Sequence, residues 1–192
     1  MTSDQQSFAG GFASPAHDSA RAFRSIMNAM ARPGSIEPLL GGQPPTPVSV
    51  AAGTLILTLC DPDTSIALKG EHDTVSVRNW ITFHTSAPFA AEGEADFVLG
   101  TWEAIVPLAP YKVGTAEYPD RSATLIVEQA ELAAAGAVLR GPGIKTQASL
   151  NLPDAVALEA NHAQFPLGLD CFFCAADKVA ALPRSTRCEE AA

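Results

Sequence analysis

The chain contains the stretch Val48-Ser-Val-Ala-Ala-Gly-Thr-Leu-Ile-Leu-Thr-Leu-Cys60, and the secondary structure of this stretch sets the class of the fold. Thr46-Pro47, directly before it, supply an N-cap and a proline of the kind found in the first helical turn. No charged residue occurs from Pro38 through Cys60, so the sequence predicts a helix that is buried on most sides. With 13 residues, the stretch is too short to cross a bilayer as a helix.

A second helix is predicted on the N-terminal side of this stretch. Ser14-Pro15 again combine an N-cap with a proline at the first helical position, and Pro33-Gly34 end the helix. The preceding residues, 1–13, are rich in Gly, Ser and Gln and are expected to be flexible. The apolar residues at helical spacing are Ala20, Phe23, Met27 and Met30. We expect this stripe to pack into the core, and contact with a partner is the alternative.

Shorter elements follow along the chain. The segment 75–83 suits a helix, although its β-branched residues leave that assignment open. The second half is richer in strands, which predicts an α/β domain over residues 14–187 with a mixed, partly antiparallel sheet. Residues 188–192 are expected to form a flexible C-terminus. The candidate strands are 66–68, 96–99, 123–127, 137–140, 169–175 and 179–182, and the further helical segments are 102–108 and 153–160.

Composition limits the possible functions. The chain has 192 residues, enough for one domain with a substantial core. A net charge of −9 argues against sequence-independent binding to nucleic acid, which needs a basic surface. The first residues lack the regions of a signal peptide, so we expect a cytoplasmic protein without membrane contact. Hydrophobic residues make up 47% and charged ones 17%, which hints at a surface given over to a partner.

The C-x-x-C spacing of Cys171 and Cys174 is also found in redox and zinc sites. Their surroundings, 169–175, are aromatic and apolar and predict a buried strand. Because residues three apart on a strand point to opposite faces, we interpret both cysteines as core residues; a functional pair is the alternative. The histidines form no paired pattern, and no metal site is predicted.

Several motifs together resemble one known family, PhnH, whose members are subunits of the bacterial carbon–phosphorus lyase machinery that degrades phosphonates. The resemblance spans roughly residues 20 to 187. The motifs are Ala22-Phe-Arg-Ser-Ile-Met-Asn-Ala-Met-Ala-Arg-Pro-Gly34, Leu57-Thr-Leu-Cys-Asp-Pro-Asp-Thr64, Phe83-His-Thr-Ser-Ala-Pro88, Ala123-Thr-Leu-Ile-Val127, Leu139-Arg-Gly-Pro-Gly-Ile144, Phe165-Pro-Leu-Gly-Leu-Asp170 and Leu182-Pro-Arg-Ser-Thr186.

The resemblance to PhnH implies a fold, partners and a pathway that the sequence patterns alone do not indicate. It implies a three-layer αβα core, akin to the large domain of pyridoxal-phosphate-dependent transferases but without the cofactor. It implies a homodimer when the chain is alone, and PhnG-, PhnI-, PhnJ- and PhnK-like partners. In the implied pathway, a phosphonate is joined to the ribose of ATP with loss of adenine, and a separate iron–sulfur subunit later cleaves the C–P bond.

Candidate ligand residues are those whose chemistry suits an anion. Arg140 and Lys145 flank the segment Gly-Pro-Gly-Ile. This segment could cradle an anion as phosphate-binding loops do, although a tight turn is the preferred interpretation. Arg184 and Arg187 follow a candidate strand, where ligands dock on open α/β sheets, although an exposed terminus has the same composition. His84 can titrate, although a packed histidine is preferred. No catalytic residue is predicted, because the sequence contains no nucleophile–base motif.

Two classes of function remain. The preferred one is a non-autonomous subunit of a phosphonate-processing complex. The alternative is an independent small enzyme that acts on a phosphate ligand, or a degenerate pyridoxal-phosphate transferase. Pyridoxal phosphate needs a lysine that forms a Schiff base. No lysine of this sequence stands in a motif typical of pyridoxal-phosphate enzymes, so no cofactor is predicted. The available lysines are Lys69, Lys112, Lys145 and Lys178.

Overall fold

A computed structural model describes residues 8–190 of the chain. Its centre is a six-stranded sheet in the order β1-β8-β7-β4-β3-β2. The four strands β2, β3, β4 and β7 pair in parallel, and β8 and β1 extend the sheet in antiparallel fashion. The strands are β1 (Glu37–Pro38), β2 (Ile66–Leu68), β3 (Phe97–Thr101), β4 (Thr124–Glu128), β7 (Asp170–Ala175) and β8 (Lys178–Leu182). The predicted α/β class and the mixed, partly antiparallel sheet are therefore confirmed.

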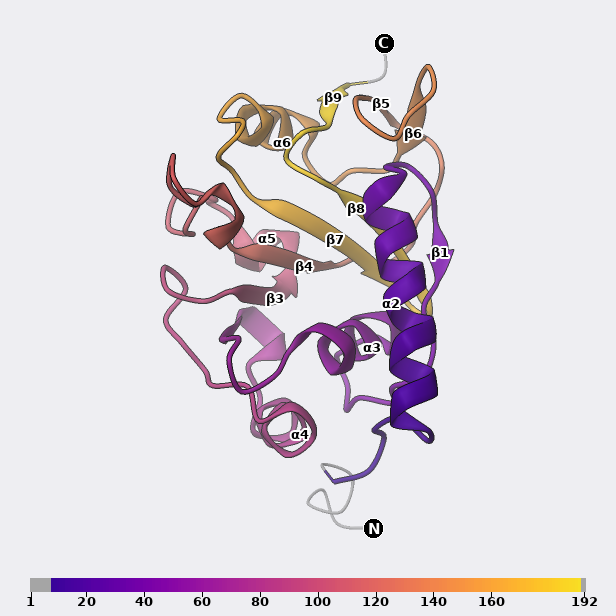
Figure 1. Ribbon diagram of the computed structural model, residues 1–192, viewed down its shortest axis with the longest axis vertical. Helices are drawn as coiled ribbons and strands as arrows, with labels where there is room; N and C mark the ends of the chain where they lie inside the picture. The colour runs from indigo at the N-terminus through magenta and orange to yellow at the C-terminus, as the bar shows by residue number, and fades with distance from the viewer. Residues whose placement is uncertain (1–7, 191–192) are drawn as a thin grey trace.

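A second sheet is small and antiparallel, in the order β6-β5-β9. It comprises β5 (Ala137–Arg140), β6 (Ala148–Leu150) and β9 (Arg187–Glu189). In Figure 1 this sheet lies with helix α6 at one end of the molecule, away from α4. The helices are α2 (Pro15–Ala31), α3 (Val50–Leu59), α4 (Val75–Thr85), α5 (Trp102–Ile105) and α6 (Ala155–His162), with 3-10 turns η1 (Gly70–His72) and η2 (Pro119–Arg121).

The large sheet is buried on both faces because alternate residues of its strands enter two separate cores. On β4, Ile126 packs with helices α2, α3 and α4, whereas Leu125 and Val127 pack with α5, α6 and the small sheet. Strands that are apolar on both faces are typical of sheets covered by helices on each side. Figure 1 shows α2 running along β8 and β1 at the antiparallel edge.

The two cysteines of the C-x-x-C spacing follow the same alternation. Cys171 belongs to the core on one face of β7, and Cys174 belongs to the core on the other face. Both are buried free thiols, as are Cys60 and Cys188. Burial raises the pKa of Cys60 to about 12, so these thiols are unreactive in the folded protein.

Helix α3 is buried as predicted, although it begins later than Thr46-Pro47 indicates. Ser49 is its N-cap, and the Ser49 hydroxyl accepts a hydrogen bond from the Ala52 amide at 3.1 Å. The helix carries an unbroken buried run from Ala51 to Ile56. Leu57 is only partly buried at the edge of this core.

The structure corrects the predicted buried face of α2. The helix begins and ends close to its predicted limits, but it buries Ala22, Ile26 and Ala29 rather than Phe23 and Met27. Phe23 is 48% exposed and Met27 is 50% exposed. Met30 of the predicted stripe is partly buried against the core, as expected, whereas Ala20 is exposed. The core under α2 receives Ile26 and two alanines, and Phe23 and Met27 lie on the outer face.

The folded chain extends beyond both ends of the predicted domain, residues 14–187. Of the N-terminal segment expected to be flexible, residues 1–7 lie outside the described range, and the Ala9 carbonyl accepts a hydrogen bond from Trp80 Nε1 at 3.0 Å. At the other end, Cys188 is 1% exposed within β9, so the folded chain continues past residue 187. Among residues 8–190, no helix has the length and apolar character required to span a bilayer.

Candidate functional site

The small sheet brings two of the predicted ligand residues together. Arg140 on β5 and Arg187 on β9 are directly opposite in the antiparallel register. Within residues 8–190, neither guanidinium forms an ion pair with a carboxylate. In the described part of the chain, Arg140 donates to two neutral groups of the β5–β6 loop, the Gln147 side chain at 3.1 Å and the Thr146 carbonyl at 3.4 Å. Two unneutralised cations side by side form a candidate anion site.

A cavity of about 750 Å³ opens beside these arginines. We call it the arginine cavity. Its wall combines the end of α6, the Gly-Pro turn after β5 and the segment that enters β9. The lining residues are Arg140, Gly141, Pro142, Glu159, His162, Ala163, Phe165, Ser185, Arg187 and Glu189.

His162 adds an imidazole to the arginine cavity. Its Nδ1 donates to the Arg184 carbonyl at 2.8 Å, which holds the ring in place. Glu159, on the same helix, accepts from the Cys188 amide at 2.8 Å. The two arginines are therefore accompanied by an imidazole and by two carboxylates, Glu159 and Glu189, of which Glu159 is engaged with the backbone.

The Gly-Pro-Gly segment after Arg140 is a tight turn that packs against the end of α2. Gly143 has a φ of +83°, and a Cβ at this position would stand 2.0 Å from the Ala31 carbonyl oxygen. Only glycine fits both the conformation and the contact. The turn positions Arg140 at the edge of the cavity, while Lys145 lies exposed in the loop beyond and does not line it.

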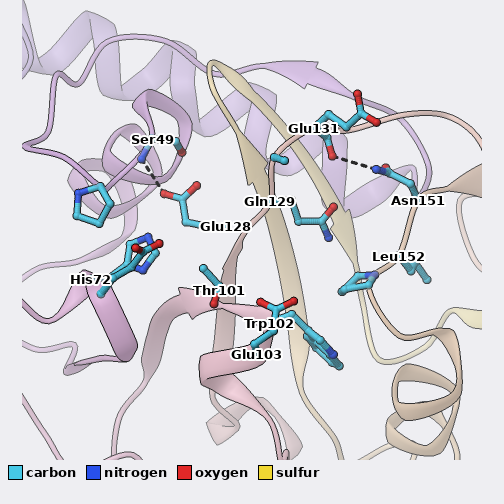
Figure 2. Close-up of a pocket in the computed structure, with 14 residues that line it drawn as sticks. Ser49, His72, Thr101, Trp102, Glu103, Glu128, Gln129, Glu131, Asn151 and Leu152 are labelled. Atoms are coloured by element: carbon cyan, nitrogen blue, oxygen red, sulfur yellow. Dashed lines mark hydrogen bonds between the residues drawn. The ribbon is translucent and has the colours of Figure 1, made fainter.

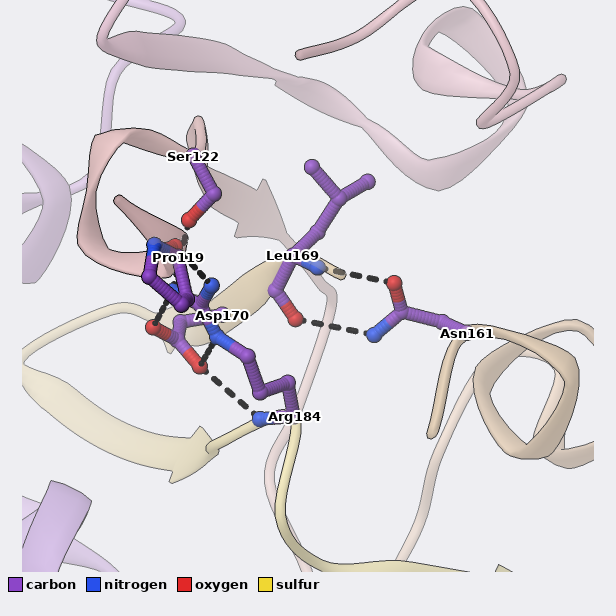
Figure 3. Close-up of polar contacts among 6 residues, drawn as sticks. All are labelled: Pro119, Ser122, Asn161, Leu169, Asp170 and Arg184. Carbon is purple, nitrogen blue, oxygen red and sulfur yellow. Dashed lines mark hydrogen bonds and ion pairs between the residues drawn. The ribbon is translucent and has the colours of Figure 1, made fainter. Parts of the chain in front are cut away.

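Arg184 has a structural role in this fold. Its guanidinium contacts both carboxylate oxygens of Asp170, with Nη2 2.5 Å from Oδ2 and Nε 3.1 Å from Oδ1. The same group donates to the Ser122 hydroxyl at 2.6 Å and to the Pro119 carbonyl at 2.5 Å. Figure 3 shows these bonds joining the start of β7, the segment after β8 and the turn before β4. The guanidinium is thus used within the protein.

His84 lies in a different part of the molecule from Arg140 and Arg187. It stands near the end of α4, with its ring 5.1 Å from Trp80 and 4.9 Å from Phe83, centroid to centroid. Its Nε2 is 3.2 Å from the Ala9 carbonyl oxygen. The ring is half-buried, packs on these aromatic neighbours and lines a separate cavity with Gly11 and Phe12.

A second cavity, of about 670 Å³, lies at the carboxyl ends of the parallel strands. We call it the acidic cavity. Figure 2 shows its side chains reaching in from the ends of β3 and β4, from η1 and from the loop before α6. The lining residues are Pro47, Ser49, Glu71, His72, Thr101, Trp102, Glu103, Glu128, Gln129, Ala130, Glu131, Asn151, Leu152 and Pro153. Ligands of open α/β sheets dock at this end of the strands.

Glu128 is the most buried of the glutamates that line the acidic cavity. It ends β4, and its Oε1 accepts from the Ser49 amide at the start of α3 at 2.7 Å. Burial raises the pKa of Glu128, against the lowering effect of the hydrogen bonds from Ser49. A helix N-terminus favours a nearby negative charge, so Ser49 partly offsets the burial of this carboxylate.

Two side-chain atoms among the residues that line the acidic cavity are buried without a hydrogen-bond partner in the described part of the chain. His72 is 1% exposed, and its Nδ1 is buried without a hydrogen bond within the described residues. Burial lowers the pKa of His72, although Glu71 and the Lys69 carbonyl act in the opposite direction. The Nε2 of Gln129 is likewise buried and unpaired in the described part of the chain. Buried polar atoms without partners are uncommon in folded proteins.

The lysines do not meet the requirements of a Schiff-base site in either cavity. Lys69 pairs with Glu92, and Lys112 pairs with Asp96 at 2.5 Å. Neither these two nor Lys145 and Lys178 line the acidic or the arginine cavity.

The sequence did not single out His162 or the acidic cavity. His162 carries no motif, and its position depends on the unpredicted strand β9 packing on α6. Glu128 and Thr101 end the parallel strands β4 and β3, just beyond the predicted strands 123–127 and 96–99. Strand ends in an α/β sheet are favoured ligand positions, and this signal was available from the sequence. Glu71 and His72 come from a 3-10 turn that the sequence pattern does not mark.

Comparison with known proteins gives consistent results along the chain. The family model for "Bacterial phosphonate metabolism protein (PhnH)" matches residues 10–189. The "Alpha-D-ribose 1-methylphosphonate 5-triphosphate synthase subunit PhnH" of Rhizobium meliloti (strain 1021) is 41% identical over 199 aligned residues, covering 98% of this chain and 99% of that protein. The "Putative C-P lyase subunit protein HtxG" of Stutzerimonas stutzeri is 28% identical over 171 residues, covering 86% of this chain and 83% of that protein.

Proposed function

Because the chain belongs to the PhnH family of bacterial phosphonate metabolism proteins, we propose that it is a non-autonomous subunit of an enzyme that joins ribose triphosphate to an alkylphosphonate. In this reaction a phosphonate oxygen forms a bond to C1′ of the ribose of ATP, the bond from C1′ to adenine breaks, and adenine is released. The observation that carries the proposal is 41% identity to a named subunit of such a synthase across 99% of its length.

The chain works with partner subunits in this proposal. PhnG-, PhnI-, PhnJ- and PhnK-like proteins complete the complex, and one of them cleaves the C–P bond. Iron–sulfur chemistry needs several thiolates around one cluster. Cys171 and Cys174 face opposite sides of β7, within two different cores, which supports assigning that step to a partner.

The arginine cavity supplies an anion contact in this scheme. Arg140 and Arg187 are exposed, lie opposite one another and have no carboxylate partner in the described chain. Guanidinium groups suit the oxygens of phosphonate and phosphate. We propose that they hold a phosphonate or a phosphate group of the nucleotide, whereas Arg184 supports the fold from its bonds to Asp170.

The outer face of α2 supplies a contact surface. Phe23 and Met27, both about half exposed, form an apolar patch on one helix. We propose that this patch lies in a homodimer when the cytoplasmic chain is alone and is available to partners in the complex. The proposed likeness to the large domain of pyridoxal-phosphate-dependent transferases concerns the layered fold and not the cofactor.

The test is co-expression of the full chain with its PhnG-, PhnI-, PhnJ- and PhnK-like neighbours. The mass of the purified assembly should include this chain, and release of adenine from ATP in the presence of methylphosphonate should require it. The chain alone should release none. Adenine release by the isolated chain would favour the independent enzyme, and a wild-type rate from an assembly that lacks the chain would contradict the subunit role.

A further inference from the structure

Phe165 places an exposed aromatic ring in the wall of the arginine cavity. The residue is 58% exposed, although the backbone around it is fixed by the turns that follow α6. The Phe165 amide donates to the His162 carbonyl at 2.9 Å, and the Leu167 amide donates to the Gln164 carbonyl at 2.9 Å. The backbone therefore holds this ring at the surface of the cavity.

Neighbouring side chains fix the ring further. The imidazole of His162 lies nearly parallel to it, with an angle of 24° between the planes and 6.4 Å between the centroids. Asn161 exchanges two hydrogen bonds of 2.8 Å with the backbone of Leu169, which closes the loop that carries Phe165 (Figure 3). An aromatic surface that is ordered before a ligand arrives loses little entropy on binding.

The arginine cavity offers a suitable group for each part of a nucleotide. A nucleobase stacks on an exposed aromatic ring, which Phe165 supplies. Phosphate oxygens suit the guanidinium groups of Arg140 and Arg187. Glu189 lies two residues beyond Arg187 on β9, so both side chains leave the same face of the strand. A carboxylate accepts hydrogen bonds from hydroxyl groups such as those of ribose.

A small phosphonate would use only part of this cavity. Its oxygens could contact Arg140 and Arg187, but an alkylphosphonate has no aromatic face to stack on Phe165 and no ribose hydroxyl to donate to Glu189. The cavity volume of about 750 Å³ is within the range of sites that enclose drug-sized ligands. The combination of arginines, a carboxylate and an exposed ring therefore favours a nucleotide.

We propose that the arginine cavity binds the nucleoside triphosphate and not the phosphonate. The base stacks on Phe165, and Arg140 and Arg187 hold phosphate oxygens. This inference rests on the anion contact in the proposed function, and it chooses between the two ligands that were left open there.

The test compares ATP with tripolyphosphate, which has the phosphate chain but no base or ribose. Both are titrated into the full chain at low ionic strength, and calorimetry measures the affinities. Phe165→Leu should bind ATP about tenfold more weakly, because it removes the stacking ring, and should bind tripolyphosphate as the wild type does. Phe165→Trp keeps a ring and should retain the affinity for ATP. Arg140→Ala/Arg187→Ala should weaken the binding of both ligands.

Phe83→Leu is the matched control, because Phe83 on α4 is 55% exposed and lies outside the arginine cavity. It should bind ATP as the wild type does, and thermal unfolding checks that every variant is folded. An undiminished affinity of Phe165→Leu for ATP, an equal loss for both ligands, or the same loss in Phe83→Leu would overturn the nucleotide assignment and leave the anion contact standing. Failure of the wild type to bind either ligand would overturn both. The subunit role is measured separately, by adenine release from the assembled complex.

Discussion

Arg140 and Arg187 face each other across the β5–β9 pair, as direct partners in an antiparallel register. Like charges at directly opposite positions destabilise a sheet. The arrangement places two guanidinium groups side by side at the wall of one cavity, where an oxyanion would neutralise both. We therefore propose that the pair binds an anion and that it lowers the stability of the small sheet when no anion is bound.

This pairing leads to a prediction about anion binding. Tripolyphosphate should raise the thermal unfolding temperature of the wild type, and Arg140→Ala/Arg187→Ala should abolish most of that rise, because the variant lacks both donors. Without the anion, the variant should be as stable as the wild type or slightly more stable. The control is Arg121→Ala/Lys178→Ala, which makes the same charge change outside the cavity and should keep the full response. An undiminished response in the Arg140/Arg187 variant would remove the anion site.

Arg184 should behave in the opposite way, as a residue needed for folding. Its side chain is 12% exposed and that of Asp170 is 24% exposed. Arg184→Met removes the guanidinium from the Asp170 carboxylate, which keeps, within residues 8–190, only the Arg184 backbone amide at 2.8 Å, and should lower the free energy of unfolding by about 3 kcal/mol. Urea denaturation measures the loss. The double variant Asp170→Asn/Arg184→Met should recover part of it, and additive losses would mean that the two residues are not coupled.

Helix α3 provides a comparison of neighbouring positions. Ile56 is 0% exposed within the core, whereas Leu57 is partly buried. Ile56→Ala should lower the free energy of unfolding by about 2–5 kcal/mol, and Leu57→Ala should lower it by less than half as much. Equal losses at the two positions in denaturant titration would show that α3 packs with a different face inward.

Glu128 should make stability depend on pH. Its pKa in the folded protein is raised, with burial as the main cause, so the folded state holds this proton more tightly than the unfolded chain does. The free energy of unfolding therefore falls as pH rises through and above 4.5, the ordinary value for glutamate. Glu128→Gln should be at least as stable as the wild type at pH 7, and the difference should shrink below pH 4.5. A variant that is less stable at pH 7 would indicate that the hydrogen bond from Ser49 outweighs burial.

The outer face of α2 should control self-association. Phe23→Asp/Met27→Asp places two charges on the exposed apolar patch, so it should convert the proposed dimer to a folded monomer. Light scattering gives the mass, and circular dichroism checks the fold. The control Val75→Asp/Val156→Asp changes two exposed apolar residues on other helices and should remain dimeric. A dimer that survives both changes would place the interface elsewhere.

The elements that the sequence predicted best are those with uniform apolar character. The uncharged run of α3 and the aromatic strand β7 carry strong local signals, and both are buried as expected. Strand β9 was missed because its three residues alternate between exposed and buried, a pattern that an exposed terminus also shows. The inner face of α2 was assigned wrongly at Phe23 and Met27, although Met30 packs against the core as expected. The structure instead buries Ile26 with the small residues Ala22 and Ala29.

The candidate sites were less predictable than the fold because they depend on contacts between distant segments. Arg140 and Arg187 were each proposed from their local motifs, but their pairing requires β9. Arg184 stands in the same motif as Arg187, and only the tertiary structure distinguishes its contact with Asp170 from an exposed role. Spacing along the sequence indicates residue types suited to a ligand; it does not show which of them are already occupied by the protein.

The four buried thiols allow local unfolding of the chain to be measured by their reactivity. Burial raises the pKa of Cys60 at the end of α3 and of Cys188 on β9 to about 12 in each case, while Cys171 and Cys174 lie in the central sheet. An alkylating reagent should therefore modify each position only as fast as the surrounding segment exposes it. Peptide mass spectrometry after brief alkylation would then distinguish fraying of the C-terminal strand from unfolding of the whole domain, in the purified chain and inside an assembled complex, without any introduced label.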